Sequence, residues 1–202
     1  MKKGRPRNFD IDECLDKAME IFWRNGYAGT TIPDLTGAMG INRPSLYAAF
    51  GSKKELFERV LDRYRSGPAS YVNRAIAKKT ALGVFEALMT GVVDLVTDPE
   101  RPGGCLFVCG GLAGNSESQS VVDELSKRRL AGEEDIRARF AKAKAEGDLR
   151  PGADPAVLAK LAATLIWGLS VQAAGGASQD ELMTVARLAV RDMEVHFTAS
   201  GN

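Results

Sequence analysis

The chain has 202 residues, of which 45% are hydrophobic and 26% are charged, and its formal net charge is +1 at pH 7. That length fits one large domain or a small domain joined to a larger one, and the apolar content is sufficient for a buried core. The first 65 residues carry 12 Lys and Arg against 9 Asp and Glu, and the remainder carries 15 against 17, so the positive charge gathers at the N-terminal end.

Three further features bear on the compartment. The cysteines, at positions 14, 105 and 109, do not make a disulfide framework, which favours a reducing environment. The basic start "MKKGRPRNFD" is not followed by an apolar run, so it is not a signal peptide. No stretch reaches the ~18 unbroken apolar residues of a membrane helix. We therefore expect a soluble, cytoplasmic protein without a membrane partner.

Helical periodicity runs through nearly the whole chain, and strand patterns are absent. The first predicted helix has its apolar residues on one face. Asp10 caps it, Glu13 completes a capping box, and Gly26 ends it.

Three more helix starts follow within a short distance. Thr31 caps a second, short helix that Gly40 stops. Asn42 caps a third, which runs to about position 50. Ser52 and Glu55 form a capping box that opens a longer helix. These signals predict a compact bundle over the first 66 residues.

The later helices are longer. Periodicity predicts helices at about 82–96, 117–146, 155–174 and 179–197, with a turn at 97–104 and a short apolar stretch, "CLFVCGGLAG", after it. Asp154 with Pro155 starts the third of these, and Ser178 with Glu181 starts the last. The sequence thus predicts an all-α fold with a basic flexible arm (1–8), a helix-turn-helix domain (9–51), a linking helix (52–66) and a larger helical domain (67–202).

The two short helices joined by "MGIN" fit a helix-turn-helix, whose second helix lies in the major groove of DNA with its N-terminal residues toward base edges. Arg43 at its start can donate to guanine O6 and N7 or to a phosphate. Tyr47 offers a hydroxyl to a phosphate, and Lys53 adds a cation at the next helix start. Two alternatives stay open: Tyr47 as half-buried packing and Arg43 as a solvated surface residue.

The stretch "GYAGTTIPDLTGAMGINRPSLYAAFGSKKELF" (26–57) resembles the DNA-binding signature of the tetracycline-repressor (TetR) family of bacterial transcription regulators. The residues in the family pattern are Gly26, Tyr27, Thr30, Thr31, Leu35, Gly40, Leu46, Tyr47, Phe50, Ser52 and Lys53. The match covers roughly residues 9–60. One departure is Ala49, where many members have a histidine, so one phosphate contact is in doubt.

The resemblance implies a ligand-responsive regulator, more often a repressor than an activator, that binds a near-palindromic operator as a dimer. It also implies a helical domain that dimerises and encloses a small-molecule pocket. The DNA contacts that it implies are Thr31, Arg43, Pro44, Ser45, Tyr47 and Lys53. The linking helix that starts at Ser52 is the expected lever between the two domains.

The basic arm is a second nucleic-acid signal. Glycine and proline prevent it from folding, so its cations can reach a neighbouring minor groove. These cations are Lys2, Lys3, Arg5 and Arg7. The alternative is a solvated tail that aids solubility.

The predicted helices 155–174 and 179–197 carry more apolar surface than one buried stripe needs. Pairing them with their copies would give a four-helix dimer interface. The alternative is a central position within one monomer.

Candidate pocket residues are bulky apolar side chains, each of which is also a candidate for plain core. They are Phe85, Leu88, Met89, Val92, Phe107, Val108, Phe140, Trp167 and Val171. Few charges interrupt these faces, so we expect an uncharged or weakly polar effector.

Cys105 and Cys109 are spaced i and i+4, which on a helix puts both thiols on one face. They are apolar core fillers, reactive thiols of a redox or electrophile sensor, or ligands of a metal. With His196 as the only histidine, neither a metal site nor a cofactor is expected. A single histidine also argues against an enzyme with a Ser-His-Asp or Cys-His catalytic arrangement. A helical adaptor that binds only protein is the remaining rival, and it leaves the Arg43–Lys53 cluster without a purpose.

Overall fold

The computed structural model describes residues 9–110 and 119–197, and this part of the chain is helical without a named strand, as predicted. The α-helices are α1 (Ile11–Gly29), α2 (Ile32–Met39), α3 (Arg43–Phe50), α4 (Lys53–Ser66), α5 (Tyr71–Ile76), α6 (Ala81–Val96), α7 (Leu106–Cys109), α8 (Gln119–Ala145), α9 (Pro155–Ala174) and α10 (Gln179–Met193). Short 3₁₀ turns lie at η1 (Pro68–Ser70) and η3 (Glu194–His196). An isolated bridge joins Leu149 to Phe197.

The predicted helix starts are confirmed by their caps. The side chains of Thr31, Ser52 and Ser178 form reciprocal capping boxes with the acidic residue three positions on. Asn42 accepts from the Ser45 N–H at 2.9 Å and so caps α3. At α1 the cap is confirmed but the capping box is wrong: Asp10 accepts from the backbone, whereas the Glu13 carboxylate pairs with Lys17 at 2.6 Å.

Gly26 interrupts α1 as predicted, but the chain turns helical once more before Gly29. Its φ of +67° lies in the left-handed region, which favours glycine. A Cβ there would lie 3.4 Å from the Gly110 carbonyl oxygen. The break therefore lets α1 approach the segment that follows α7.

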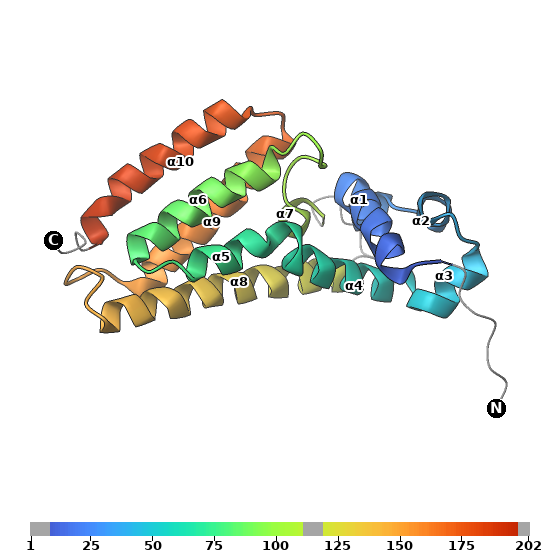
Figure 1. Cartoon of the computed structure of the whole chain (residues 1–202), viewed down its shortest axis with the longest axis horizontal. Helices are drawn as coiled ribbons and strands as arrows, with labels where there is room; N and C mark the ends of the chain where they lie inside the picture. The colour runs from blue at the N-terminus through green and yellow to red at the C-terminus, as the bar shows by residue number, and fades with distance from the viewer. Residues whose placement is uncertain (1–8, 111–118, 198–202) are drawn as a thin grey trace.

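The helices form two groups, which meet where α4 lies beside α8 (Figure 1). Helices α1, α2 and α3 form one end of the molecule, with α4 packed against α1. Helices α5, α6, α8, α9 and α10 form the other, larger group, in which α8 packs on α9 and α6 on both α9 and α10. One continuous apolar core runs through both groups. Helix α3 lies at the end of the molecule opposite to the C-terminus (Figure 1).

Two parts of the larger group differ from the prediction. The sequence did not predict α5 and η1, which occupy the stretch between α4 and α6. The last helix ends at Met193 rather than 197, because Phe197 turns back into the core between Phe85 and Phe140, with ring centroids 6.1 Å away on each side.

Within the described residues, α9 is long and apolar enough to span a membrane, although the sequence shows no unbroken apolar run of that length. The core helix of a water-soluble domain passes the same test. Only 39% of the 18-residue apolar stretch within α9 is buried, so this helix carries an exposed apolar side.

Candidate functional site

Helix α3 presents its N-terminal residues outward and its apolar residues inward. Leu46 and Phe50 are 0% and 3% exposed and hold the helix against the core. Arg43, Pro44 and Tyr47 are exposed, and Ser45 is half-buried. Gly51 ends the helix with a φ of +74°, so the chain leaves it sharply. The polar edge predicted from the sequence therefore faces outward.

Arg43 and Tyr47 lie one turn apart and contact each other. An Arg43 guanidinium nitrogen donates to the Tyr47 hydroxyl at 3.4 Å, and the guanidinium carbon lies 5.5 Å from the ring centroid. Tyr47 is 39% exposed, which a fully packed residue would not be. The pair therefore forms one hydrogen-bonding unit on the outer face of α3.

Thr31 and Lys53 both interact with Asp34 near the start of α2. The Thr31 hydroxyl and the Thr31 backbone N–H donate to the Asp34 carboxylate at 2.6 and 2.8 Å, and these two hydrogen bonds lower the pKa of Asp34. Lys53 lies over the Tyr27 ring, 4.3 Å from its centroid, and burial lowers the pKa of its ammonium group. The start of α2 and the start of α4 are thus brought together beside α3.

Arg59 is a residue of this end that the sequence reading missed. From α4 it donates to the Ala49 carbonyl at 3.1 Å and lies 5.0 Å from the Phe50 ring centroid. It therefore holds the C-terminal end of α3 in place. Nothing in the local pattern around Arg59 signals this contact, because its partners are nine and ten residues earlier.

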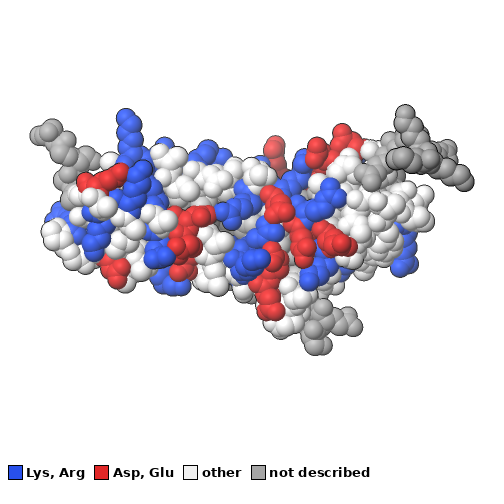
Figure 2. Space-filling view, turned by 90° about the horizontal axis from the view of Figure 1, so that it is seen from below, with Lys and Arg blue, Asp and Glu red and all other residues white. Residues whose placement is uncertain are grey.

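Other charged residues lie along the underside of the molecule. Figure 2 shows acidic and basic side chains interspersed over this face, where α4 and α8 run in Figure 1. Arg65 pairs with Asp135 at 2.6 Å, and Arg128 pairs with Asp62, so α4 is joined to α8 twice. The predicted arm residues Lys2, Lys3, Arg5 and Arg7 lie outside the described residues.

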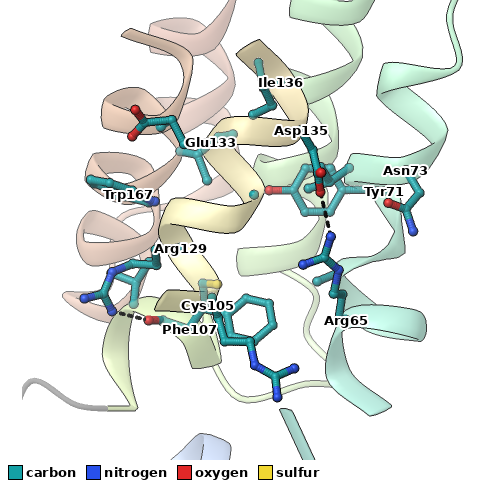
Figure 3. A pocket seen from close by; sticks show the side chains of 17 residues that line it. Arg65, Tyr71, Asn73, Cys105, Phe107, Arg129, Glu133, Asp135, Ile136 and Trp167 are labelled. Carbon is teal, nitrogen blue, oxygen red and sulfur yellow. Dashed lines mark hydrogen bonds and ion pairs between the residues drawn. The ribbon is translucent and has the colours of Figure 1, made fainter. Parts of the chain in front are cut away.

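A cavity opens between α4, α5, α7, α8 and α9; about 80 Å³ of it can be reached by the centre of a water-sized sphere, and its atom-free space is about 690 Å³ when the open solvent at its mouth is included. Of the predicted pocket residues, Phe107, Val108 and Trp167 line it. Figure 3 shows Trp167 and Arg129 on one side of this cavity and Tyr71 and Arg65 on the other.

The other predicted pocket residues lie elsewhere. Phe85, Leu88, Met89, Val92 and Phe140 are at most 1% exposed and do not line this cavity. Val171 is 46% exposed on the outer side of α9.

The cysteines do not share a helix face as the spacing suggested. Cys105 is the extended residue that precedes α7, and only Cys109 lies in the helix. Burial raises the pKa of both thiols, so both are protonated at neutral pH. Cys14 is buried separately in α1. Among the described residues, no cluster of His, Cys, Asp or Glu has the make-up of a metal site.

The segment around α7 touches both the cavity and the N-terminal helices. The Trp23 indole N–H donates to the Gly104 carbonyl at 3.0 Å, and the Tyr27 N–H donates to the Gly110 carbonyl at 3.2 Å. The Tyr64 ring packs edge-on against Trp23 and Phe107, with centroids 4.8 and 4.9 Å away. A shift of the Phe107 side chain would therefore displace Tyr64 on α4 and, through it, Trp23 on α1.

An apolar face remains exposed on α9 and α10. Val157 and Val171 are 62% and 46% exposed, and Val185 and Leu188 are 48% and 47% exposed. An apolar patch formed by such side chains would be a candidate surface for binding another molecule.

Two family descriptions match the chain. Residues 15–60 match "Bacterial regulatory proteins, tetR family", and residues 81–189 match "Tetracyclin repressor-like, C-terminal domain".

Individual proteins match over nearly the full length. The HTH-type transcriptional repressor ComR of Escherichia coli (strain K12) is 31% identical over 191 residues, which cover 94% of this chain and 91% of ComR. A cysteine mutant of the TetR family transcriptional regulator CifR, solved with 26 bp double-strand operator DNA, is 39% identical with a TM-score of 0.88, covering 93% of this chain and 98% of CifR. A putative TetR transcriptional regulator from Rhodococcus sp. RHA1 is 43% identical with a TM-score of 0.62, covering 94% of this chain and all of that one.

Proposed function

The chain belongs to the TetR family of bacterial regulatory proteins, and we propose that it represses transcription by holding α3 against operator DNA until a small molecule releases it. The observation that carries this is the outward-facing start of α3, with Arg43, Pro44 and Tyr47 exposed above a buried base of Leu46 and Phe50. Exposed residues at the N-terminal end of such a helix read base edges in the major groove.

The individual contacts follow from their positions. Arg43 would donate to a guanine edge, with Pro44 and Ser45 beside it. Tyr47 and Lys53 would donate to phosphates. Thr31 would do so from the start of α2 when its hydroxyl turns from the Asp34 carboxylate to the DNA. The basic arm would add minor-groove contacts next to this site. A DNA-binding regulator of this kind works in the bacterial cytoplasm.

A second copy is part of the proposal. The exposed apolar face of α9 and α10 would pair with its equivalent in a second copy, giving a four-helix interface. Two copies of α3 would then reach half-sites about 34 Å apart on a near-palindromic operator.

Release would follow from occupation of the cavity. Its lining includes Phe107 on α7 and Arg65 on α4, and both helices contact α1. A ligand that fits only one arrangement of these helices shifts the population by its differential affinity. The linking helix α4 would thus act as a lever together with α7. A thiol sensor is less favoured, because burial raises the pKa of Cys105 and Cys109.

A mobility-shift assay with the DNA upstream of the protein's own transcription unit tests the proposal. We expect a shifted complex, and we expect Arg43→Ala to weaken it by at least about 5- to 150-fold, the effect of losing one base contact, since the variant loses one in each half-site. Lys127→Ala is the matched control, because Lys127 is a cation with an 80% exposed side chain on α8. A chain that ignores duplex DNA at low salt, or an equal loss in both variants, would contradict the proposal and favour a protein-binding adaptor.

A further inference from the structure

We propose that the cavity takes a small organic anion, with an apolar body between Trp167 and Phe107 and a carboxylate-like group on Arg129. The inference deepens the proposed function, on which its role as effector rests, because it names the chemical class of the ligand. It differs from the uncharged effector expected from the sequence. The prediction of an uncharged effector was based on the apolar faces of the predicted helices. Arg129 lies on the charged helix α8, and the sequence did not show that it lines the cavity.

The charges around the cavity are paired, with one exception. Arg65 pairs with Asp135, and Arg128 pairs with Asp62 and Glu124. Glu133, which also lines the cavity, pairs with Lys160 at 2.6 Å.

Arg129 is the exception among the described residues, because no carboxylate lies within ion-pairing distance of its guanidinium. It donates instead to two neutral acceptors, the Phe107 carbonyl at 2.6 Å and the Ser126 hydroxyl at 2.8 Å. The cavity wall therefore carries one positive charge that no described acid balances.

The surroundings of Arg129 favour an anion. The side chain is half-buried, and loss of water lowers the pKa of its guanidinium. A buried charge is costly unless an opposite charge pairs with it. A guanidinium has five N–H donors in a planar fork, so two hydrogen bonds leave donors for a carboxylate. An anion at this point would regain part of the lost solvation.

The rest of the lining sets the shape and polarity of the ligand body. Apolar side chains contributed by α7, α8 and α9 surround the space next to Arg129. They are Phe107, Val108, Ile136, Ala163, Ile166 and Trp167. Among the described residues, both acids of the lining, Glu133 and Asp135, already pair with a cation, so they leave no free acid for a cationic ligand. A short aliphatic or monocyclic aromatic acid fits these constraints.

A matched ligand series on the full chain tests this. Phenylacetate, benzoate and the straight-chain carboxylates from butanoate to decanoate would be titrated by calorimetry without DNA, each beside its amide and its amine. We expect carboxylates to bind, and we expect at least one to bind tenfold or more tightly than its own amide. Amides or amines that bind as tightly as the acids, or a series that fails to bind at millimolar concentration, would overturn the proposal.

Variants locate the binding. Arg129→Gln should weaken carboxylate binding about tenfold or more, while Arg129→Lys, which keeps the charge but not the fork, should weaken it less. Arg137→Gln is the control, because Arg137 lies on the same helix and, among the described residues, pairs with Glu134 at the surface. An unchanged affinity in a folded Arg129→Gln protein would place the anion elsewhere and refute the assignment.

The experiments distinguish a failure of the proposed operator binding from a failure of the proposed carboxylate binding. Carboxylate binding is measured without DNA, so it survives if the mobility shift fails. Conversely, a chain that shifts operator DNA but binds no carboxylate keeps the proposed function and loses only this inference.

Discussion

Tyr64 is the residue at which the two helix groups meet. It is fully buried on α4, its hydroxyl lies 3.4 Å from the Cys105 thiol, and it accepts from the Leu106 N–H at 3.3 Å. Burial raises the pKa of the Tyr64 hydroxyl and of the Cys105 thiol. Both groups therefore stay neutral in the folded protein above the pH at which they ionise in an unfolded chain, and the difference is large for Tyr64.

This raises a prediction about alkaline pH. A pKa raised by folding gives stability that is complete below the ordinary value, 9.0 for Cys105 and 10.0 for Tyr64, and is lost as pH rises toward the folded value. We expect the free energy of unfolding, measured by urea titration, to fall from about pH 9 upward.

Tyr64→Phe is the variant that assigns the effect. It should cost about 1–3 kcal/mol at pH 8, because the buried Leu106 N–H loses its acceptor. Its stability should then decline less steeply with pH than that of the parent chain. Parallel pH profiles for the two proteins would show that the Tyr64 hydroxyl does not contribute.

Helix α5 is the element whose place depends on a neighbour rather than on its own sequence. Neither α5 nor η1 has a side-chain cap, and α5 is only six residues long. Its Tyr71 ring fits against α6 at Gly91, where an added Cβ would lie 2.5 Å from a ring carbon. Glycine at this position lets the two helices approach.

Gly91→Ala should therefore destabilise the fold. We expect a loss of about 1–3 kcal/mol in the free energy of unfolding, since the Tyr71 ring is buried and must shift. Gly37→Ala is the control, because in the described part of the chain no atom lies within 4 Å of a Cβ added at Gly37 in α2, and alanine there should be neutral or stabilising. Thermal unfolding of both variants tests this prediction. An equal loss of stability in Gly91→Ala and Gly37→Ala would contradict the packing argument.

The same contrast explains which elements the sequence predicted. Helices α2, α3, α4, α9 and α10 begin at capping residues that bond to their own first turn, so a local signal sufficed. Helices α5 and α7 have no such bond and follow from packing, which no local pattern records.

The candidate site divides in the same way. The exposed edge of α3 follows from residues within one short stretch, and its DNA contacts stay predictions. The cavity combines Arg65, Tyr71, Arg129 and Trp167 from four helices far apart in the chain. Periodicity selected Trp167 but could not select the others, because their meeting depends on how the helices pack.

At the scale of the whole molecule, the proposed dimer is the main prediction. One chain has a mass of 21.7 kDa, and sedimentation should give twice that value. Leu188→Glu places a charge on the exposed apolar face of α10 and should shift the protein toward monomer and weaken operator binding. Leu130→Glu is the control, because Leu130 is 57% exposed on α8, outside that face. A parent chain that sediments as a monomer would refute the pairing.

The exposed face of α9 and α10 has a consequence for gene control. If only the pair recognises the operator, and most chains are single at low expression, operator occupancy rises with the square of the amount of protein in the cell. A twofold drop in synthesis would then lower occupancy about fourfold, by mass action alone. Dilution during growth would thus relieve the promoter steeply even before any effector arrives.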